Sequence, residues 1–201
     1  MKPVSVALVA LLAAPIVASA STWELDSGHS TTGFSVRHLM VSNVLGTFGK
    51  TSAIAHFDDK EITLSSVEAT IDAASIDTRD AKRDEHLRGA DFFDVANHPK
   101  LTFKSTKVEK AGAGHLRVLG DLSIHGVTKP VVLEVNGPSE PVKTPWGQTR
   151  LGLSASTKIS RKDFGLTWNK ALEKGGVIVG DEVTISIEAE FAEQAPKAAA
   201  K

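Results

Sequence analysis

The sequence predicts an all-β protein, an eight-stranded antiparallel β-barrel with a short helix at one end. Apolar and polar residues alternate along many short segments, which is typical of strands that bury one face. Turns rich in glycine and proline separate these segments, and about eight strands can be counted. A sheet of that size with one apolar face must close on itself or split into two layers, so a β-sandwich is the alternative.

The N-terminus has the features of a secretory signal. Lys2 is followed by an apolar stretch over residues 4–17 and by the small residues Ala18-Ser19-Ala20. We therefore expect a cleavable signal peptide at residues 1–20 and, in a bacterium, a periplasmic protein. No second long apolar run follows, so we expect no stable membrane span.

Composition narrows the function classes further. Without residues 1–20, which include Lys2, the formal net charge of −1 becomes −2, which does not favour nucleic acid. The chain contains no cysteine, so an exported form must be stabilised by its core alone. We expect one domain over residues 21–192 and a disordered tail over residues 193–201.

The predicted strands share one apolar and one polar face, as an antiparallel sheet with one solvated side requires. Four turn signals separate them, at residues 112–114, 126–130, 136–138 and 175–176. The alternating segments lie at residues 34–37, 67–73, 101–104, 116–125, 131–135, 151–159 and 183–191.

One charged segment, residues 78–88, interrupts this pattern and is predicted to be a helix. Asp77 or Thr78 can cap its start, and Gly89 fits its end. A helix this polar buries little by itself, so it must lean on apolar neighbours. We expect it to cover one end of the barrel, either as a plug or as a lid that contacts a ligand.

Catalytic and metal-binding patterns are weak. Asp26, His29 and Ser30 are the residue types of a catalytic triad, but no Gly-x-Ser-x-Gly segment accompanies them. Asp80, Asp84, Glu85 and His86 are conceivable metal ligands, yet no His-x-x-x-His or His-Glu-x-x-His spacing occurs, and a solvated helix face explains them better. We expect neither catalysis nor a bound metal.

A set of short motifs resembles the YceI-like family of bacterial polyisoprenoid-binding proteins across about residues 22–192. These motifs are DSGHS at 26–30, FSVRHL at 34–39, GTF at 46–48, SIDT at 75–78, RDEHL at 83–87, DFFD at 91–94, PKLTFKS at 99–105, GDLSIHGVTKP at 120–130 and SRKDFG at 160–165. The resemblance implies an extended, lipocalin-like barrel around an elongated apolar cavity. It also implies a periplasmic carrier of isoprenoid-tailed lipids, with no cofactor beyond a bound isoprenoid or quinone-like lipid and with a homodimer as a possible assembly.

An apolar tunnel needs almost no polar groups, because an unpaired buried polar atom costs about 1–3 kcal/mol. The candidate lining residues are Phe34, Val36, His38, Phe48, Ile71, Ile76, Leu87, Phe92, Phe93, Phe103, Leu122, Ile124, Leu153, Ile159, Phe164, Trp168 and Ile185. The alternative for each is ordinary core packing.

A polar head group would need separate donors, since burial of the tail alone gives little specificity. The candidates are Arg37, Arg79, Arg83, His86, Arg88 and Arg161, with His38 as a further possibility. The alternative is that the arginines are solvated and pair with Asp80, Asp84, Asp91 and Asp163. Two other functions stay open, namely an enzyme acting on such a lipid and an interaction module for a membrane redox partner.

Overall fold

The computed structural model describes residues 20–173 and 175–195. The predicted signal peptide, apart from Ala20, and residues 196–201 of the predicted tail lie outside this range. The predicted tail from residue 193 begins inside the fold. The last strand continues to Glu193, and the Gln194 backbone N–H donates to Thr22 O at 2.8 Å.

Twelve strands, all paired antiparallel, make up most of the described chain. They are β1 Ser21–Leu25, β2 Thr31–His38, β3 Ser42–Phe48, β4 Thr51–Phe57, β5 Ser66–Asp72, β6 Ile76–Asp77, β7 Lys100–Gly112, β8 His115–Ile124, β9 Val127–Asn136, β10 Val142–Lys143, β11 Thr149–Ser160 and β12 Val179–Glu193. The helices are α1 Ala81–Arg88 and the short 3₁₀ turns η1 Ile62–Leu64, η2 Ala73–Ser75 and η3 Arg161–Phe164.

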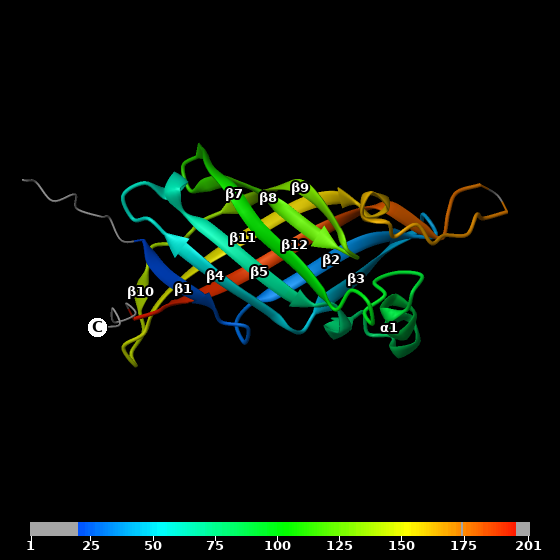
Figure 1. Ribbon diagram of the computed structural model, residues 1–201, viewed down its shortest axis with the longest axis horizontal. Helices are drawn as coiled ribbons and strands as arrows, with labels where there is room; N and C mark the ends of the chain where they lie inside the picture. The colour runs from blue at the N-terminus through cyan, green and yellow to red at the C-terminus, as the bar shows by residue number, and fades with distance from the viewer. Residues whose placement is uncertain (1–19, 174, 196–201) are drawn as a thin grey trace, which may run out of the picture.

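Eight of these strands close into a barrel, which confirms the predicted fold class over the sandwich (Figure 1). The ring runs β11-β9-β8-β7-β5-β4-β1-β12, and β12 pairs again with β11 along eleven Cα partners from Ser160↔Glu182 to Arg150↔Ala192. Closure leaves no free sheet edge in the ring and encloses an interior.

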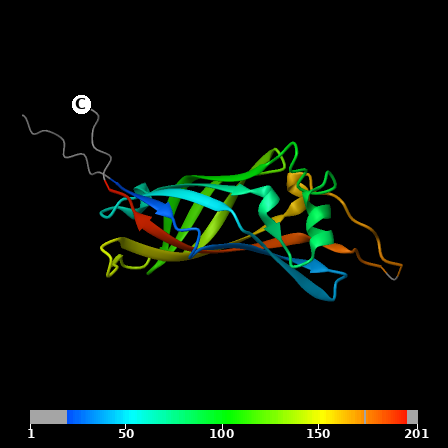
Figure 2. The same cartoon turned by 90° about the horizontal axis from the view of Figure 1, so that it is seen from below.

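The sheet extends beyond the ring because β12 is long enough to pair with two strands, β1 and β2, along the edge opposite β11. Its C-terminal part pairs with β1, for example Phe191↔Leu25, while its N-terminal part pairs with β2, for example Ile185↔Phe34. β3 and β6 then continue the sheet from β2. Figures 1 and 2 show the result as an elongated molecule with α1 beside one end and β10 at the other.

Two predictions about α1 need correction. The helix begins at Ala81 after an Asp80 cap, whose carboxylate accepts from the backbone N–H groups of Lys82 and Arg83 at 3.1 Å, so neither Asp77 nor Thr78 is the cap. Asp84 does not lie on a solvated face but is 6% exposed. It accepts hydrogen bonds from the Thr78 backbone N–H at 2.9 Å and the Thr78 hydroxyl at 2.5 Å. A carboxylate can be buried here because these donors replace water.

Strands β3 and β4 are absent from the predicted alternating segments because, in the middle of each strand, a large residue points outward beside small residues that point inward. In β4, Ala53 and Ala55 are 8% and 1% exposed, while Ile54 between them is 51% exposed. In β3, Leu45 is 57% exposed and its neighbour Gly46 is buried. At these positions the small residues are inside and the large residue is outside, which reverses the hydrophobic contrast on which the alternation rule depends.

Candidate functional site

An apolar cavity of about 180 Å³ lies inside the barrel. A single water needs only about 10–15 Å³ on a comparable measure, so this space is far larger than a packing defect. All eight ring strands contribute to its wall, through residues two apart whose side chains share the inner face. On β8, these residues run from Leu116 to Ile124, which is about 26 Å along the strand. The cavity is therefore elongated along the barrel.

Glycines make room for two of the aromatic rings in the wall. A Cβ added to Gly120 of β8 would lie 2.4 Å from Phe103 Cζ, and a Cβ added to Gly46 of β3 would lie 2.3 Å from Phe34 Cζ. Both rings lie over the backbone of a neighbouring strand at positions where any side chain would displace them. These glycines thus determine how far each ring reaches into the cavity.

Eight of the predicted lining residues lie in the cavity wall. They are Phe34, Phe48, Ile71, Phe103, Leu122, Ile124, Leu153 and Ile185. The fold brings these eight side chains together on the inner face of the barrel. Their contact with a ligand stays a prediction.

The other nine predicted lining residues are placed outside this wall. Val36 and His38 lie on the part of β2 that extends past the ring, and Ile159 lies near the end of β11. The remainder gather around α1 and η3, where Ile76 and Phe164 are only 1% and 2% exposed. This group consists of Ile76, Leu87, Phe92, Phe93, Phe164 and Trp168.

The aromatic residues after α1 form a packed cluster at this end. The Phe92 and Trp168 rings lie 5.2 Å apart, and the His86 ring is edge-on to both at 5.0 Å. The Phe93 ring is 5.7 Å from that of Phe48, which itself lines the cavity. The segment that contains His86, Phe92 and Phe93 therefore covers this end of the barrel. Phe93 contacts Phe48, and Phe48 in turn lines the cavity.

Sequence reasoning missed part of the wall for two different reasons. Leu116, Val118 and Val135 belong to predicted apolar faces, but nothing local distinguishes a residue facing empty space from one packed in a core. Ala53 and Ala55 gave no signal because alanine is small and common in every environment.

The three predicted head-group arginines in α1 and η3 bind backbone carbonyls instead. Arg83 donates to Thr78 O at 2.8 Å, and Arg88 donates to Ala74 O at 2.8 Å and Ile76 O at 2.7 Å. Arg161, 4% exposed, donates to Gly180 O at 2.9 Å, to Trp168 O at 2.9 Å and to Leu166 O. Burial lowers the pKa of Arg161 below its ordinary value, and nearby Asp181 opposes this shift.

The remaining head-group candidates also lie outside the cavity wall. Arg37 donates to Met40 O at 2.9 Å beyond the ring, and Arg79 is exposed before α1. The His86 Nε2 atom is 2.9 Å from Asp91 Oδ2. Among the described residues, no arginine or lysine lines the cavity. The structure therefore does not bring the predicted cations into the cavity wall.

A second hollow of about 240 Å³ adjoins the cavity where the β1–β2 and β3–β4 connections meet. Leu25, Ser30, Phe48 and Thr51 line both spaces. Hydroxyl groups dominate the polar part of this hollow, from Ser27, Ser30, Thr31, Thr47 and Thr51. These residues can hydrogen-bond an uncharged polar group but supply no charge.

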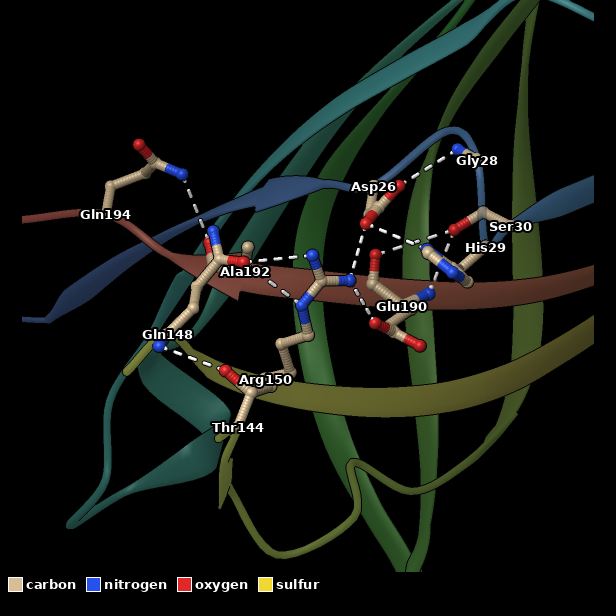
Figure 3. A network of polar contacts seen from close by, with 10 residues as sticks. All are labelled: Asp26, Gly28, His29, Ser30, Thr144, Gln148, Arg150, Glu190, Ala192 and Gln194. Carbon is tan, nitrogen blue, oxygen red and sulfur yellow. Dashed lines mark hydrogen bonds and ion pairs between the residues drawn. The ribbon is translucent and has the colours of Figure 1, made fainter. Parts of the chain in front are cut away.

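An ionic network lies on the outer side of the wall next to this hollow (Figure 3). Arg150 of β11 donates from Nη1 to Asp26 Oδ2 at 2.5 Å and to Glu190 Oε1, and its other nitrogens contact Gln148. Hydrogen bonds from His29 and then Arg150 lower the pKa of Asp26 from 3.8 to about 2. Arg150 and Glu190 alternate with the buried Leu151 and Phe191, so the network lies on the outer face of the barrel wall. Through Asp26 it connects the β1–β2 loop to β11 and β12.

The triad-like residues are not arranged as a triad. His29 Nδ1 is 3.0 Å from Asp26 Oδ2, but the Ser30 hydroxyl accepts from the Glu190 backbone N–H at 2.9 Å and lies 3.5 Å from Glu190 O. A serine nucleophile needs a hydrogen bond to its base, and here its hydroxyl is bound to the backbone of β12.

Comparison with known proteins places these features in a family. A family model described as a YceI-like domain matches residues 23–191. A UPF0312 protein of Vibrio cholerae is 39% identical over 166 residues, covering 81% of this chain and 86% of the relative. A UPF0312 protein of Shewanella putrefaciens is 38% identical over 157 residues, covering 77% and 82% of the two chains.

Solved structures share the barrel. The Campylobacter jejuni YceI protein is 33% identical, with a TM-score of 0.68 over 79% of this chain and 90% of that one. BcnA of Burkholderia cenocepacia is 26% identical, with a TM-score of 0.73 over 83% and 98%. A domain of Saccharophagus degradans, described as polyisoprenoid-binding, has a TM-score of 0.61 at 16% identity and shows the fold alone. In the described part of this chain, no helix is both long and apolar enough to cross a bilayer.

Proposed function

The chain belongs to the YceI-like family, and on that basis we propose that it binds a long apolar chain of the isoprenoid type inside its barrel. The single observation that carries the proposal is the elongated cavity of about 180 Å³, whose wall is built from the apolar inner faces of all eight ring strands. A cavity lined in this way excludes charged and highly polar molecules, because their polar groups would find no partners.

The energetics favour a chain rather than a compact ligand. Burying about ten methylene groups contributes roughly 8 kcal/mol, and each further methylene about 0.8 kcal/mol. Association costs on the order of 4–15 kcal/mol must be offset, so a short apolar molecule would bind weakly. We therefore expect affinity to increase with chain length until the cavity is full.

The polar end of the ligand is proposed to be uncharged. The hollow that adjoins the cavity offers the hydroxyl groups of Ser27, Thr31 and Thr47, whereas Arg88 near α1 and Arg161 of η3 bind backbone carbonyls. A quinone or alcohol can accept or donate hydrogen bonds to hydroxyl groups, whereas a phosphate requires cations to compensate its charge. This favours an isoprenoid quinone or alcohol over a polyprenyl phosphate.

A periplasmic carrier role is proposed as well, supported by the signal-like residues 1–20 and by the family. Carriage requires that the ligand be held away from water and released again, which an internal cavity with a covered end allows. Binding without catalysis, and a homodimer, stay predictions.

Native mass spectrometry of the purified protein, before and after extraction with organic solvent, tests the proposal. We expect an extra mass that disappears on extraction and is restored by adding a long-chain isoprenoid quinone, but not by the quinone head group without its tail. A protein that shows no bound mass and does not take up the long-chain quinone would contradict the proposal. Preferential uptake of a polyprenyl phosphate of equal length would contradict only the uncharged head group.

A further inference from the structure

We propose that Asp94, His98 and His125 form a binding site for Zn²⁺ or another first-row divalent transition metal. One ligand atom from each residue lies within 4.8 Å of those from the other two, and all three residues are half-buried. This site lies outside the cavity wall and does not depend on the proposed lipid ligand.

The sheet register brings these residues together from separate parts of the sequence. His98 comes two residues before β7, and His125 follows β8 directly. The pairing Thr102↔Ser123 in the antiparallel β7–β8 ladder places the start of β7 beside the end of β8. As a result, the two imidazole rings lie 4.7 Å apart with 67° between their planes.

The backbone around Asp94 holds its carboxylate in position. Asp94 has a φ of 45°, and its carbonyl accepts from the backbone N–H groups of Asn97 at 3.0 Å and His98 at 2.8 Å. The Asn97 side chain donates to Asp94 Oδ2 at 2.8 Å, which leaves Oδ1 available. A ligating carboxylate is commonly oriented by such a hydrogen bond to its second oxygen.

The β8–β9 turn is shaped to accept both rings. His125 has a φ of 52°, a left-handed conformation that is uncommon for a residue other than glycine. Gly126, with a φ of +74°, leaves room for His98, because a Cβ there would lie 2.7 Å from His98 Cε1. Among the described residues, the ring nitrogens of His98 and His125 make no hydrogen bond with the protein, so they are free to coordinate an ion.

Two imidazoles and one carboxylate are the donors that zinc and related metals prefer, whereas calcium and magnesium take oxygen ligands. Zinc held at about 2.0–2.1 Å needs its ligand atoms roughly 3.3 Å apart in a tetrahedron. The ligand atoms all lie within 4.8 Å of one another, so no pair has to approach by more than about 1.5 Å to reach this spacing. Three protein ligands leave one position for water or an external ligand.

Within residues 20–173 and 175–195, a second cluster of this kind, Asp26, His29 and Glu190, is a weaker candidate. Arg150 already donates to the carboxylates of both Asp26 and Glu190, so a cation is in place there. A metal ion would have to displace this guanidinium or sit beside it against charge repulsion.

Metal binding would link the segment between α1 and β7 to the end of β8. Asp94 and His98 lie in the segment that joins α1 to β7, and His125 follows Ile124, which lines the cavity. An ion bound only by the folded protein stabilises it by mass action, so saturating zinc should raise the unfolding temperature.

Untagged, metal-free protein provides the test. Zn²⁺ is titrated in competition with a chromophoric chelator, and Co²⁺ is titrated while its visible ligand-field absorption is recorded. We expect one equivalent to bind and the unfolding temperature to rise. Asp94→Asn, His98→Gln and His125→Asn should each weaken binding at least about tenfold. His29→Gln and His115→Gln, which alter histidines elsewhere, should bind as tightly as the unaltered protein.

The variants are chosen to fold. Asparagine tolerates the left-handed backbone at positions 94 and 125, and Asp94→Asn keeps an oxygen for the Asn97 hydrogen bond. If one variant does not fold, the other two decide the result. The proposal is overturned if no saturable binding occurs, if His98→Gln and Asp94→Asn both bind normally, or if only His29→Gln loses the metal.

Discussion

Phe103 lies directly over the backbone of Gly120 on the neighbouring strand, so close that a Cβ at position 120 would be 2.4 Å from the Phe103 ring and 2.6 Å from Lys104 O. The absence of a side chain at Gly120 is therefore a condition for the position of a ring that lines the cavity. A side chain introduced at position 120 should therefore move the Phe103 ring and change the shape of the cavity.

Gly120→Ala should displace the Phe103 ring and strain the β7–β8 ladder. We expect a loss of about 1–3 kcal/mol in the free energy of unfolding and weaker binding of a long-chain quinone. Gly152→Ala is the matched control, because its Cβ would meet only Ala189 O at an ordinary 3.7 Å. Urea unfolding and ligand titration of both variants check this. Equal behaviour of the two would show that Phe103 can move without cost.

Ala55→Leu should reduce ligand binding by filling the cavity. Ala55 lines the cavity and is 1% exposed, whereas its neighbour Ile54 points outward and is 51% exposed. Ile54→Leu on the same strand is the control and should leave the dissociation constant unchanged. The measurement is a titration with long-chain and shortened quinones. A cavity-filling effect should be greatest for the longest chain.

Phe93→Ala should speed up ligand release. The Phe93 ring packs edge-on against Phe48, a residue of the cavity wall, so its removal loosens the covered end. Stopped-flow displacement should show a faster dissociation rate with little change in the association rate. Phe93→Leu, which keeps most of the packing, should behave nearly like the unaltered protein. An unchanged release rate in Phe93→Ala would mean that this segment only plugs the end.

Arg161→Lys should destabilise the fold without altering ligand affinity. The guanidinium donates to carbonyls of Leu166, Trp168 and Gly180, which lysine cannot reach together. Leaving these buried carbonyls unpaired should cost about 2–4 kcal/mol of unfolding free energy. Thermal unfolding and ligand titration separate the two effects. A selective loss of ligand affinity in a fully stable variant would restore Arg161 as a head-group residue.

Asp26→Asn should lower stability at neutral pH but not in strong acid. The hydrogen bonds from His29 and Arg150 lower the Asp26 pKa from 3.8 to about 2, so its ionised form stabilises the fold above pH 3.8. This contribution disappears as the pH falls from about 4 to 2. Because the side chain is 22% exposed, we expect only about 1 kcal/mol. Unfolding free energies across pH 2–7 should show the difference shrinking below pH 4. A difference that is constant with pH would contradict the assignment.

The sequence determined the architecture because alternation is a local property. Leu116, Val118, Leu122 and Ile124 already show which side of β8 is inside, and several strands of this kind require the sheet to close on itself or to split into two layers. The Phe92–Phe93 segment was likewise predictable as a cover, since a polar helix needs apolar neighbours to dock.

Only the tertiary structure decided which inner residues face empty space and which charges are used internally. Phe103 can hold its position in the cavity wall because its ring lies over Gly120 of the neighbouring strand, and Arg161 is unavailable because carbonyls of Leu166, Trp168 and Gly180 surround it. His98 and His125 became neighbours only through the β7–β8 register. Such relationships depend on how separate segments are brought together, and a periodic pattern contains no information about which residues will then be neighbours.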